Sequence, residues 1–552
     1  MTRRIALAAL AVFAAAAPAA TAATAPGRVA FAFSEALESY AGSSGVDAHG
    51  SVALPDGGVV TLEHDAAGGS ALAVRLRADG SLDGSFGSAG IARIPVPGAG
   101  FRAHHIMRLA DGRLLIAGSQ PESPFRPGRL VVVRLLADGA LDPGFGSGGV
   151  VSTSLLALVF SSPMALGPDG SILVTGDLPR AADPDWSAPS DWAVAKLSPD
   201  GVPDPGFGVV KVPVAGDRTR ALGVAVTPTG SIVTLGAALS PAGEAGYLVG
   251  LTALGAPDPT FNGGAPANIQ LAAPMRLYRR ANGAWDVLGG QAIVRFDAHG
   301  ARDASYGSGG TVALPARGNE TQSLVALPDG GWLVVAQKES FDATPLESRL
   351  SVRRLTGNGV VTGATAALQT PFGGGFSSPH KKTRGSVAQN SFRGELLRRD
   401  DGSFVAIGRV MVNTPYGKME GEFAQFVAAA AFTRQLAPDP SFGGPRRPPV
   451  LDVRVRRRRA VDSARRRAIL VRVDAPEAGL VLLRVRDARG RLLGGSLQPV
   501  YRPGATTMQI GLTSAGTRRL RAARRGLRIS VRHEFRDIVA GTDTGVTRGR
   551  LR

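Results

Sequence analysis

The chain has 552 residues, of which 44% are hydrophobic and 19% charged, with a formal net charge of +19 and no cysteine. This length exceeds what one ordinary hydrophobic core can hold, so it predicts several domains or a repeat array. The composition is typical neither of a disordered chain nor of a membrane protein. The absence of cysteine excludes disulfides and thiolate metal sites.

Residues 1–25 have the pattern of a secretory signal peptide. The pair Arg3-Arg4 precedes an apolar run, Ile5 to Ala17, and Ala23-Thr24-Ala25 has the form of a cleavage site. The alternative is a membrane anchor, but an apolar run of about 13 residues is shorter than the roughly 20 needed to span a bilayer. We therefore expect a secreted, extracellular protein with no transmembrane anchor.

The positive charge is concentrated in the last part of the chain. Residues 446–552 hold 27 Arg, no Lys and 8 acidic residues, whereas the residues before them hold 36 basic and 36 acidic side chains. Residues 445–449 are rich in proline and arginine, as expected of a stiff linker. This composition predicts a boundary between a neutral body and a basic domain at residues 450–552.

One short pattern recurs through the body: an apolar stretch, a dipeptide that ends in glycine, and a second apolar stretch. Asp-Gly and Asn-Gly accept the positive φ angles of a type I′ turn, so each copy predicts a β-hairpin. The seven copies are centred on Asp56-Gly57, Asp111-Gly112, Asp169-Gly170, Thr229-Gly230, Asn282-Gly283, Asp329-Gly330 and Asp401-Gly402.

A second pattern alternates with the first and reads Asp-x-x-Phe-Gly after a strand and a turn. Its aspartates are Asp83, Asp142, Asp204, Asp258, Asp303 and Asp439, and the aromatic residues are Phe86, Phe145, Phe207, Phe261, Tyr306 and Phe442. The sixth repeat lacks the signature at Asn358-Gly359-Val360-Val361. A glycine-rich loop and another strand follow each copy except the last.

Each repeat therefore supplies four short strands over about 60 residues. In the second repeat we expect these strands at Ile91 to Val96, Ile106 to Leu109, Arg113 to Ala117, and Leu130 to Leu136. Four strands repeated seven times predict an all-β fold, a seven-bladed β-propeller over residues 28–444. Closure into a ring would also hide most sheet edges.

The segments RLLADGALDPGFGSGGVV, RLRADGSLDGSFGSAGIARI and ALPDGGWLVVAQ resemble the delta-60 repeat of secreted bacterial proteins. The resemblance covers roughly residues 28–444, is strong in the first three repeats and is weak in the sixth, which lacks the aromatic residue. It implies a propeller-like fold and an exported protein. It implies no catalytic residues.

The repeated aromatic and acidic residues each allow a structural and a functional interpretation. The phenylalanines could stack on sugars or bases, but we expect them to fill the gap between adjacent blades, where burying one contributes about 1.5–3 kcal/mol. The aspartates could bind calcium, but the alternating run of oxygen ligands typical of a calcium loop is missing. We expect them to cap their own turns.

We expect the hairpin turns and the Phe-Gly loops on one face of the propeller and the long insertions on the other, because connections between antiparallel strands alternate between faces. Variable loops on one rim of a repeat scaffold are a usual binding surface, although these could be idle solvated loops. The candidate binding residues of this rim are Phe125, Trp186, Trp192, Phe341, Phe376, His380, Lys381, Lys382 and Tyr416.

Known catalytic motifs are missing from the sequence: no nucleophile elbow, zinc-protease motif or Walker loop occurs. Gly144-x-Gly146-x-x-Gly149 fits the dinucleotide fingerprint by letter, but it lies between two strands and opens no helix. His104 and His105 are adjacent and point to opposite faces of a strand, so they do not form a metal pair. We expect no catalytic, cofactor or metal residues, and we lean against an enzyme.

The basic domain reads as five or more short strands, which suggests a small immunoglobulin-like β-sandwich. We expect strands at residues 450–455, 468–473, 480–486, 506–512 and 527–531, a hairpin turn at residues 487–490, and a helix at residues 514–525 capped by Ser514. Its charge is compatible with an anionic envelope polymer, with a merely solvated surface, or with nucleic acid. Few aromatic residues argue against nucleic acid.

These observations favour a non-enzymatic binding or interaction scaffold. Its partner would be an extracellular glycan, a protein or a cell-envelope polymer, and the basic domain would favour anionic surfaces. We expect a monomer without a cofactor. The alternative is a propeller hydrolase or lyase that acts on carbohydrate through carboxylates in the central channel.

Overall fold

The computed structural model describes residues 27–35, 50–65, 70–98, 100–121, 127–157, 163–180, 188–216, 218–240, 243–271, 274–289, 292–314, 321–337, 349–369, 390–413, 423–439, 441–442, 452–456, 459–475, 479–500, 504–523, 526–536 and 542–551. The expected signal peptide and linker lie outside these residues. Within them, no helix is both long enough and apolar enough to cross a membrane.

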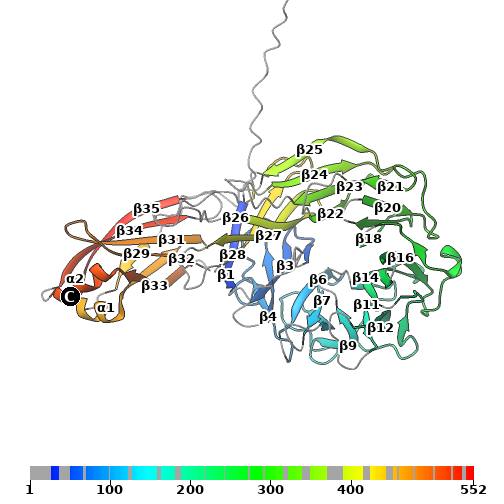
Figure 1. The fold of residues 1–552 in the computed structure, drawn as a ribbon, viewed down its shortest axis with the longest axis horizontal. Helices are drawn as coiled ribbons and strands as arrows, with labels where there is room; N and C mark the ends of the chain where they lie inside the picture. The colour runs from blue at the N-terminus through cyan, green and yellow to red at the C-terminus, as the bar shows by residue number, and fades with distance from the viewer. Residues whose placement is uncertain are drawn as a thin grey trace, which may run out of the picture.

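The body consists of antiparallel sheets whose strands follow chain order (Figure 1). The first contains β2 (Ser51–Ala53), β3 (Val59–Asp65), β4 (Ser70–Leu76) and β5 (Ile91–Ile94). An eight-stranded sheet follows. Its first half is β6 (Arg102–Arg108), β7 (Leu114–Gln120), β8 (Gly128–Leu135) and β9 (Val150–Ala157). Its second half is β10 (Met164–Leu166), β11 (Ile172–Pro179), β12 (Ser190–Leu197) and β13 (Val209–Lys211).

Three further four-stranded sheets continue the series. The first is β14 (Arg218–Val226), β15 (Ile232–Ser240), β16 (Gly243–Leu251) and β17 (Ala267–Asn268), with the short 3-10 helix η1 (Asn262–Gly264) before its last strand. The second is β18 (Pro274–Arg279), β19 (Trp285–Gly289), β20 (Ala292–Phe296) and β21 (Thr311–Ala313). The third is β22 (Thr321–Ala326), β23 (Trp332–Gln337), β24 (Arg349–Leu355) and β25 (Val361–Gln369).

The last sheet of the body joins the two ends of the propeller region. It contains β26 (Asn390–Arg398), β27 (Phe404–Asn413), β28 (Phe423–Phe432) and β1 (Gly27–Glu35), in the order β1-β28-β27-β26. The register of β1 on β28 runs from Gly27 opposite Ala430 to Glu35 opposite Phe423. A strand from the start of the chain thus completes a sheet built from residues almost 400 positions later.

Neighbouring sheets pack face against face, and the circuit is closed. Hydrophobic cores join each sheet to the next up to β22–β25, and β22 and β23 contact β26. Val405 and Ile407 of β27 share a core with Leu72 and Val74 of β4, so the last sheet packs on the first. Figure 1 shows the blue first sheet beside the yellow-green last one. Central strands such as β7 and β8 are almost wholly buried, because a neighbouring sheet covers each face.

The seven predicted hairpins are confirmed, but the predicted turn type is wrong. The turn glycines have φ between 73° and 89°, whereas none of the residues before them has a positive φ. In the first turn the Gly57 amide donates to the Leu54 carbonyl (3.0 Å) and the Leu54 amide to the Gly58 carbonyl (2.9 Å). This is a three-residue loop, a type I turn followed by a left-handed glycine, in place of a type I′ turn.

The predicted repeat unit is out of phase with the sheets by one strand. The strand after the glycine-rich loop was expected to open a blade, but β5 pairs with β4 and is the fourth strand of the preceding sheet. Each sheet therefore begins with the two hairpin strands. This one-strand shift does not change which loops share a face of the propeller, because loops between consecutive strands still alternate between the two faces. Arg113 of a hairpin turn contacts Asp142 of a Phe-Gly loop (3.0 Å), as expected for one shared face.

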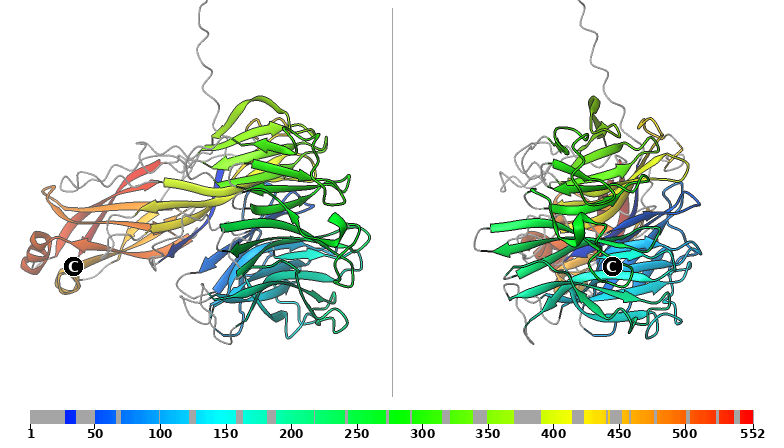
Figure 2. Two further views of the ribbon diagram at one scale, coloured as in Figure 1. Left: turned by 45° about the vertical axis from the view of Figure 1, so that its right-hand side comes forward. Right: turned by 90° about the vertical axis from the view of Figure 1, so that its right-hand side faces the viewer.

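The basic C-terminal region forms one seven-stranded sheet with two short helices, to one side of the ring (Figure 2). Its elements are β29 (Asp452–Val455), α1 (Ala460–Arg466), β30 (Ala468–Ala475), β31 (Gly479–Asp487), β32 (Leu492–Val500), β33 (Gly504–Leu512), α2 (Ser514–Ala522), β34 (Leu527–Arg536) and β35 (Thr542–Leu551). The strand order is β29-β30-β33-β32-β31-β34-β35, and the edge strands β29 and β35 contact each other. The sheet therefore curls around one core.

The five strands expected in this region are confirmed with small shifts of their ends, and the hairpin turn before Gly490 joins β31 to β32. Strands β32 and β35 and helix α1 were not predicted. The predicted helix is α2, but its cap is Thr513 instead of Ser514. The Thr513 hydroxyl accepts a hydrogen bond from the Gly516 amide (3.0 Å), which satisfies one free amide of the first turn.

Candidate functional site

The repeated aromatic residues are structural, as predicted. Phe86 and Phe145 are fully buried, and each lies against a turn glycine of the next sheet. A Cβ atom at Gly139 would be 3.0 Å from the Phe86 ring, and one at Gly201 would be 2.7 Å from the Phe145 ring. The further pairs of this kind are Phe207 with Gly255, Phe261 with Gly300, Tyr306 with Gly359, and Phe442 with Gly80. These rings are not available to stack on a ligand.

The sixth repeat shows what happens where the aromatic residue is missing. At the corresponding turn of the next sheet, the residue is Leu436 instead of glycine, and it still adopts the left-handed conformation with φ of 62°. Its amide donates to the Thr433 carbonyl (2.9 Å), as the turn glycines do in the other sheets. Of these seven turn positions, the one that carries a side chain is therefore the one that no aromatic ring of the preceding sheet contacts.

The repeated aspartates cap their own turns, which confirms the structural interpretation. Asp83 Oδ1 accepts hydrogen bonds from the Ser85 amide (3.1 Å) and hydroxyl (2.7 Å), and these bonds lower the pKa of its carboxyl group. Asp142 Oδ1 accepts from the Gly144 amide (3.0 Å). The buried guanidinium of Arg134 donates to the other oxygen of Asp142 (2.7 Å) and lies over the Phe145 ring at 4.7 Å. One carboxylate oxygen of Asp142 is therefore engaged within the turn and the other by the arginine of β8.

The predicted binding rim is described at only one of its nine candidate residues. Trp192 lies in β12 and is fully buried, with its indole Nε1 donating to the hydroxyls of Thr175 (3.2 Å) and Thr234 (3.1 Å). It is a core residue between two sheets, so its expected place on the rim is wrong. The other eight candidates lie outside the described residues: Phe125, Trp186, Phe341, Phe376, His380, Lys381, Lys382 and Tyr416.

A different cluster of polar side chains lies on the inner strands of the ring. The first strands of neighbouring sheets contact one another, as β2 does with β6 and β26, so these strands line the axis. Four of them contribute a charged or polar side chain to one place: Ser51, His105, Arg276 and Glu395. All four retain partial solvent exposure. We call these four residues the axial cluster.

Burial and neighbouring charges shift the pKa of each ionisable residue of the axial cluster. Burial raises the pKa of Glu395, although the Ser51 hydroxyl and amide and the positive charge of Arg276 oppose this rise. Burial and, to a smaller extent, the positive charge of Arg276 together lower the pKa of His105 to about 4. His105 is therefore a neutral imidazole at pH 7. Burial disfavours the charge on Arg276, but Tyr278 and Glu395 compensate and raise its pKa.

Two polar atoms of the axial cluster have no hydrogen-bond partner. Nδ1 of His105 and Oε1 of Glu395 are buried, and no described residue bonds to either. Buried polar atoms are rarely left in this state, because an unmade hydrogen bond costs about 1–3 kcal/mol. Both atoms are therefore unsatisfied among the described residues. The neighbouring His104 is different, since its Nε2 lies 2.8 Å from the Ser119 hydroxyl.

Sequence reasoning missed the axial cluster, although a weak signal existed. His105, Arg276 and Glu395 each stand within a short apolar stretch just before a hairpin turn, where a strand with both faces covered should be apolar. The three positions lie far apart in the chain. Only the closed ring brings them together.

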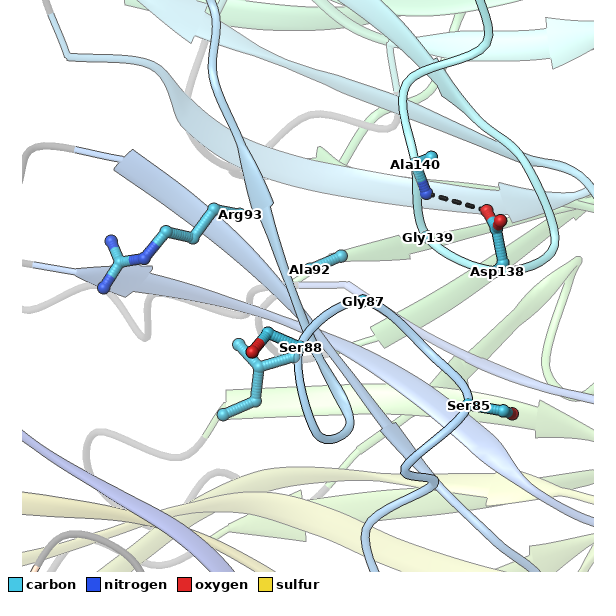
Figure 3. Close-up of a pocket in the computed structure, with 9 residues that line it drawn as sticks. Ser85, Gly87, Ser88, Ala92, Arg93, Asp138, Gly139 and Ala140 are labelled. Atoms are coloured by element: carbon cyan, nitrogen blue, oxygen red, sulfur yellow. Dashed lines mark hydrogen bonds between the residues drawn. The ribbon is translucent and has the colours of Figure 1, made fainter.

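A surface pocket of about 450 Å³ lies between the first two sheets (Figure 3). It lies where Gly87 and Ser88 approach Gly139 of the next sheet. Its polar groups are used internally: Ser85 bonds to Asp83, and Asp138 Oδ1 accepts from the Ala140 amide (3.0 Å). The pocket marks the groove over the Phe86 contact and offers a ligand few free groups.

Comparisons with known proteins agree with this architecture. The family model described as "Domain of unknown function (DUF5122) beta-propeller" matches residues 109–145 and 167–207, which are the hairpin-to-phenylalanine segments of the second and third repeats. No curated protein matches the chain in sequence.

Solved structures with a similar course of the chain include enzymes that act on carbohydrate. The polysaccharide lyase Uly1 is 8% identical, with 73% of this chain and 97% of that chain covered and a TM-score of 0.39. The GH93 α-L-arabinofuranosidase of Fusarium graminearum is 13% identical, with coverage of 62% and 97% and a TM-score of 0.35. TM-scores below 0.5 support no conclusion about function. The all-β sheets and the family-model match identify the body of this chain as a β-propeller.

Proposed function

We propose that this protein is a secreted, non-enzymatic β-propeller that binds an extracellular glycan, a protein or a cell-envelope polymer. In this proposal the propeller has seven blades of delta-60-like repeats over residues 28–444. The C-terminal region forms one seven-stranded sheet that curls around its core, in place of the two sheets of the expected immunoglobulin-like sandwich, and its basic surface favours anionic partners. The antiparallel four-strand units and their closure through β1 support the ring.

The observation that carries the proposal is the unsatisfied axial cluster. Sugar hydroxyls both donate and accept hydrogen bonds, so they suit Oε1 of Glu395 and Nδ1 of His105 equally well. Arg276 adds a donor beside them. A glycan end or side branch that enters the channel would satisfy atoms that the protein leaves unpaired. This makes a glycan the partner that the described residues favour.

A non-enzymatic role is favoured by the number of carboxylates. Glycoside hydrolysis needs two carboxyl groups on either side of the bond that is cleaved. In the inner strands β2, β6, β10, β14, β18, β22 and β26, as far as the structure describes them, Glu395 is the single carboxylate. A lone carboxyl group next to an arginine can hold a sugar without cleaving it.

The alternative, a hydrolase or lyase that acts on carbohydrate, is favoured by one observation. The pKa of Glu395 is raised by burial, and a carboxyl group that keeps its proton to higher pH can serve as a general acid. Binding and catalysis therefore involve the same residue and differ in whether a product is formed.

The test measures binding and product formation on the full chain. Calorimetry against a panel of neutral and acidic polysaccharides should find a ligand whose affinity falls at least about tenfold in Glu395→Gln, as expected for losing a hydrogen bond to a charged group. The control Asp111→Asn changes an exposed carboxylate on the turn face and should bind as the wild type does. Release of reducing or unsaturated ends that depends on Glu395 would overturn the non-enzymatic role.

The predicted rim remains part of the proposal. The eight candidates outside the described residues include Trp186 and Tyr416, whose aromatic side chains suit stacking on sugar rings. Replacing both by alanine should weaken glycan binding, and the melting temperature of the double variant is the control for folding. Unchanged affinity in this double variant, together with a loss in Glu395→Gln, would restrict the site to the channel.

A further inference from the structure

Three neighbouring strands of the C-terminal sheet carry arginine at alternate positions. Strands β31, β34 and β35 lie side by side in this order (Figure 1). We call the outward-facing residues of these strands the arginine face: Arg484, Arg486, Arg528, Arg532, Arg548 and Arg550. The residues between them, such as Val485, Ile529 and Val531, are buried in the core. The period of two therefore directs all six guanidinium groups to one side of the sheet.

The strand register places like charges directly opposite each other on this face. Arg484 of β31 stands opposite Arg532 of β34, and Arg528 of β34 stands opposite Arg550 of β35. Opposite charges stabilise such cross-strand pairs, whereas like charges destabilise them. Two arginine pairs on adjacent strands are thus a cost to the fold, unless an anion lies between the side chains.

Five of the six arginines of this face are not neutralised by a carboxylate of the described residues. Within the described residues, Arg484, Arg486, Arg528, Arg532 and Arg548 form no ion pair with a carboxylate. Elsewhere in the same domain arginines are paired: Asp487 binds both Arg491 (3.0 Å) and Arg519 (2.5 Å). Asp487 therefore binds arginines outside the arginine face, and Glu534 of β34 is an acid at one of the outward positions of this face.

We infer that the arginine face binds an extended anionic polysaccharide, with carboxylate or sulfate groups on successive sugars. Outward positions repeat about every 6.8 Å along a strand and about every 4.8 Å between strands. A chain of evenly spaced anions can therefore contact several guanidinium groups at once. Each contact is a charge-assisted hydrogen bond, bidentate where the geometry allows it.

A polysaccharide fits this face better than a nucleic acid does. Single-stranded nucleic acids are held by aromatic side chains on which bases stack, in addition to positive charge. The arginine face offers no aromatic ring among its described residues, since Phe535 of β34 is fully buried on the other side of the strand. Recognition here depends on charge spacing alone.

This inference rests on the proposed function, in which the C-terminal region favours anionic surfaces, and it assigns that preference to specific residues. It is independent of the axial cluster. A chain whose Glu395→Gln variant has lost binding to a neutral glycan should keep its binding to a polyanion. Loss of binding at the axial cluster and loss of binding at the arginine face can therefore be distinguished.

The test uses the full chain and polygalacturonate, with dextran as a neutral comparison. Binding of polygalacturonate should weaken steeply between about 50 mM and 500 mM NaCl, because screening shortens the reach of the charges. The triple variant Arg528→Ser, Arg532→Ser and Arg548→Ser should lose at least about 30-fold in affinity. All three side chains are exposed, so the melting temperature should not fall.

The matched control removes the same charge elsewhere in the domain, through Arg489→Ser, Arg518→Ser and Arg521→Ser, which are also exposed. The affinity of this control variant for polygalacturonate should fall less than about threefold, because its three arginines act on the polymer only through long-range electrostatic attraction. Equal losses in the two variants would overturn the site, and so would binding that ignores salt. Tighter binding to duplex DNA than to polygalacturonate at one salt concentration would overturn the polysaccharide assignment.

Discussion

The ring of Phe442 lies directly on Gly80, so that a Cβ atom at Gly80 would come within 2.5 Å of the ring. Phe442 follows the last sheet of the body and Gly80 belongs to the first, so this contact closes the ring. Gly80 also has a φ of 81°, which disfavours any side chain. An aromatic ring also lies on a turn glycine between other neighbouring sheets, so substitution of these glycines measures how much each contact contributes to the stability of the ring.

Gly80→Ala should reduce the free energy of unfolding by about 2–4 kcal/mol, because it adds a clash to the cost of the positive φ. Gly148→Ala is the matched control, since Gly148 has a φ of 62° and open space around it, and it should cost about 1 kcal/mol. Urea denaturation of the two variants measures the difference. Equal costs would mean that the Phe442 contact does not matter to closure.

Leu436→Gly should stabilise the protein by about 0.5–1 kcal/mol, because it relieves a left-handed conformation that leucine disfavours. Leu254 occupies the neighbouring position of the same turn in another sheet, is 83% exposed and has no positive φ. Leu254→Gly should instead cost about 0.5–1 kcal/mol through the greater freedom of the unfolded chain. Thermal denaturation should therefore shift in opposite directions for the two variants.

Asp286→Ala should destabilise the protein by about 3–5 kcal/mol. This fully buried carboxylate accepts hydrogen bonds from Arg295 Nε (2.6 Å), Arg280 Nη1 (3.0 Å) and Trp332 Nε1 (2.6 Å), so its removal takes away the negative charge that balances two buried cations. Asp329→Ala removes an exposed partner of Arg354 and should cost less than about 1 kcal/mol. Chemical denaturation that gives similar losses would contradict this assignment.

The pH dependence of stability should include a contribution from Asp177. Burial raises the pKa of its carboxyl group to about 7, against the opposing effects of the Ala221 amide, Arg220 and Arg218. Because the folded state binds this proton more tightly than the unfolded state, the contribution is full below about pH 4 and is lost as the pH rises to about 7.

Asp177→Asn keeps an acceptor for the Ala221 amide, which lies 2.8 Å from Oδ1, but carries no charge. It should raise the free energy of unfolding at pH 8 by about 1–3 kcal/mol and leave it nearly unchanged at pH 4. Denaturation curves at the two pH values measure this. A gain of the same size at both would show that the effect is not ionisation.

Local sequence patterns predicted the elements well because they depend on short-range chemistry. The hairpin glycines, the aspartate caps and the buried rings each follow from a few neighbouring residues. The turn type was missed because the sequence Asp-Gly occurs in both kinds of turn, and aspartate favours a helical φ over the left-handed φ that a type I′ turn requires. The phase of the repeat was missed because a strand pairs equally well with a neighbour on either side.

The candidate site was harder to predict, because it depends on long-range closure. Trp192 was placed on the rim as an aromatic residue next to an insertion, but the hydroxyls of Thr175 and Thr234 give its indole a place in the core. His105, Arg276 and Glu395 come from three separate repeats and show no common spacing. Their strands surround one axis only after the ring has closed.

The pairing of β1 with β28 has a consequence for biosynthesis. As the chain emerges, residues Gly27–Glu35 have no partner strand until residues Phe423–Phe432 have been made. Bringing the two segments together closes the longest loop of the body, and non-local pairings of this kind are slow to form. During that interval β1 is a free edge that can pair with the wrong strand. A chaperone that shields this segment would therefore raise the yield of folded protein.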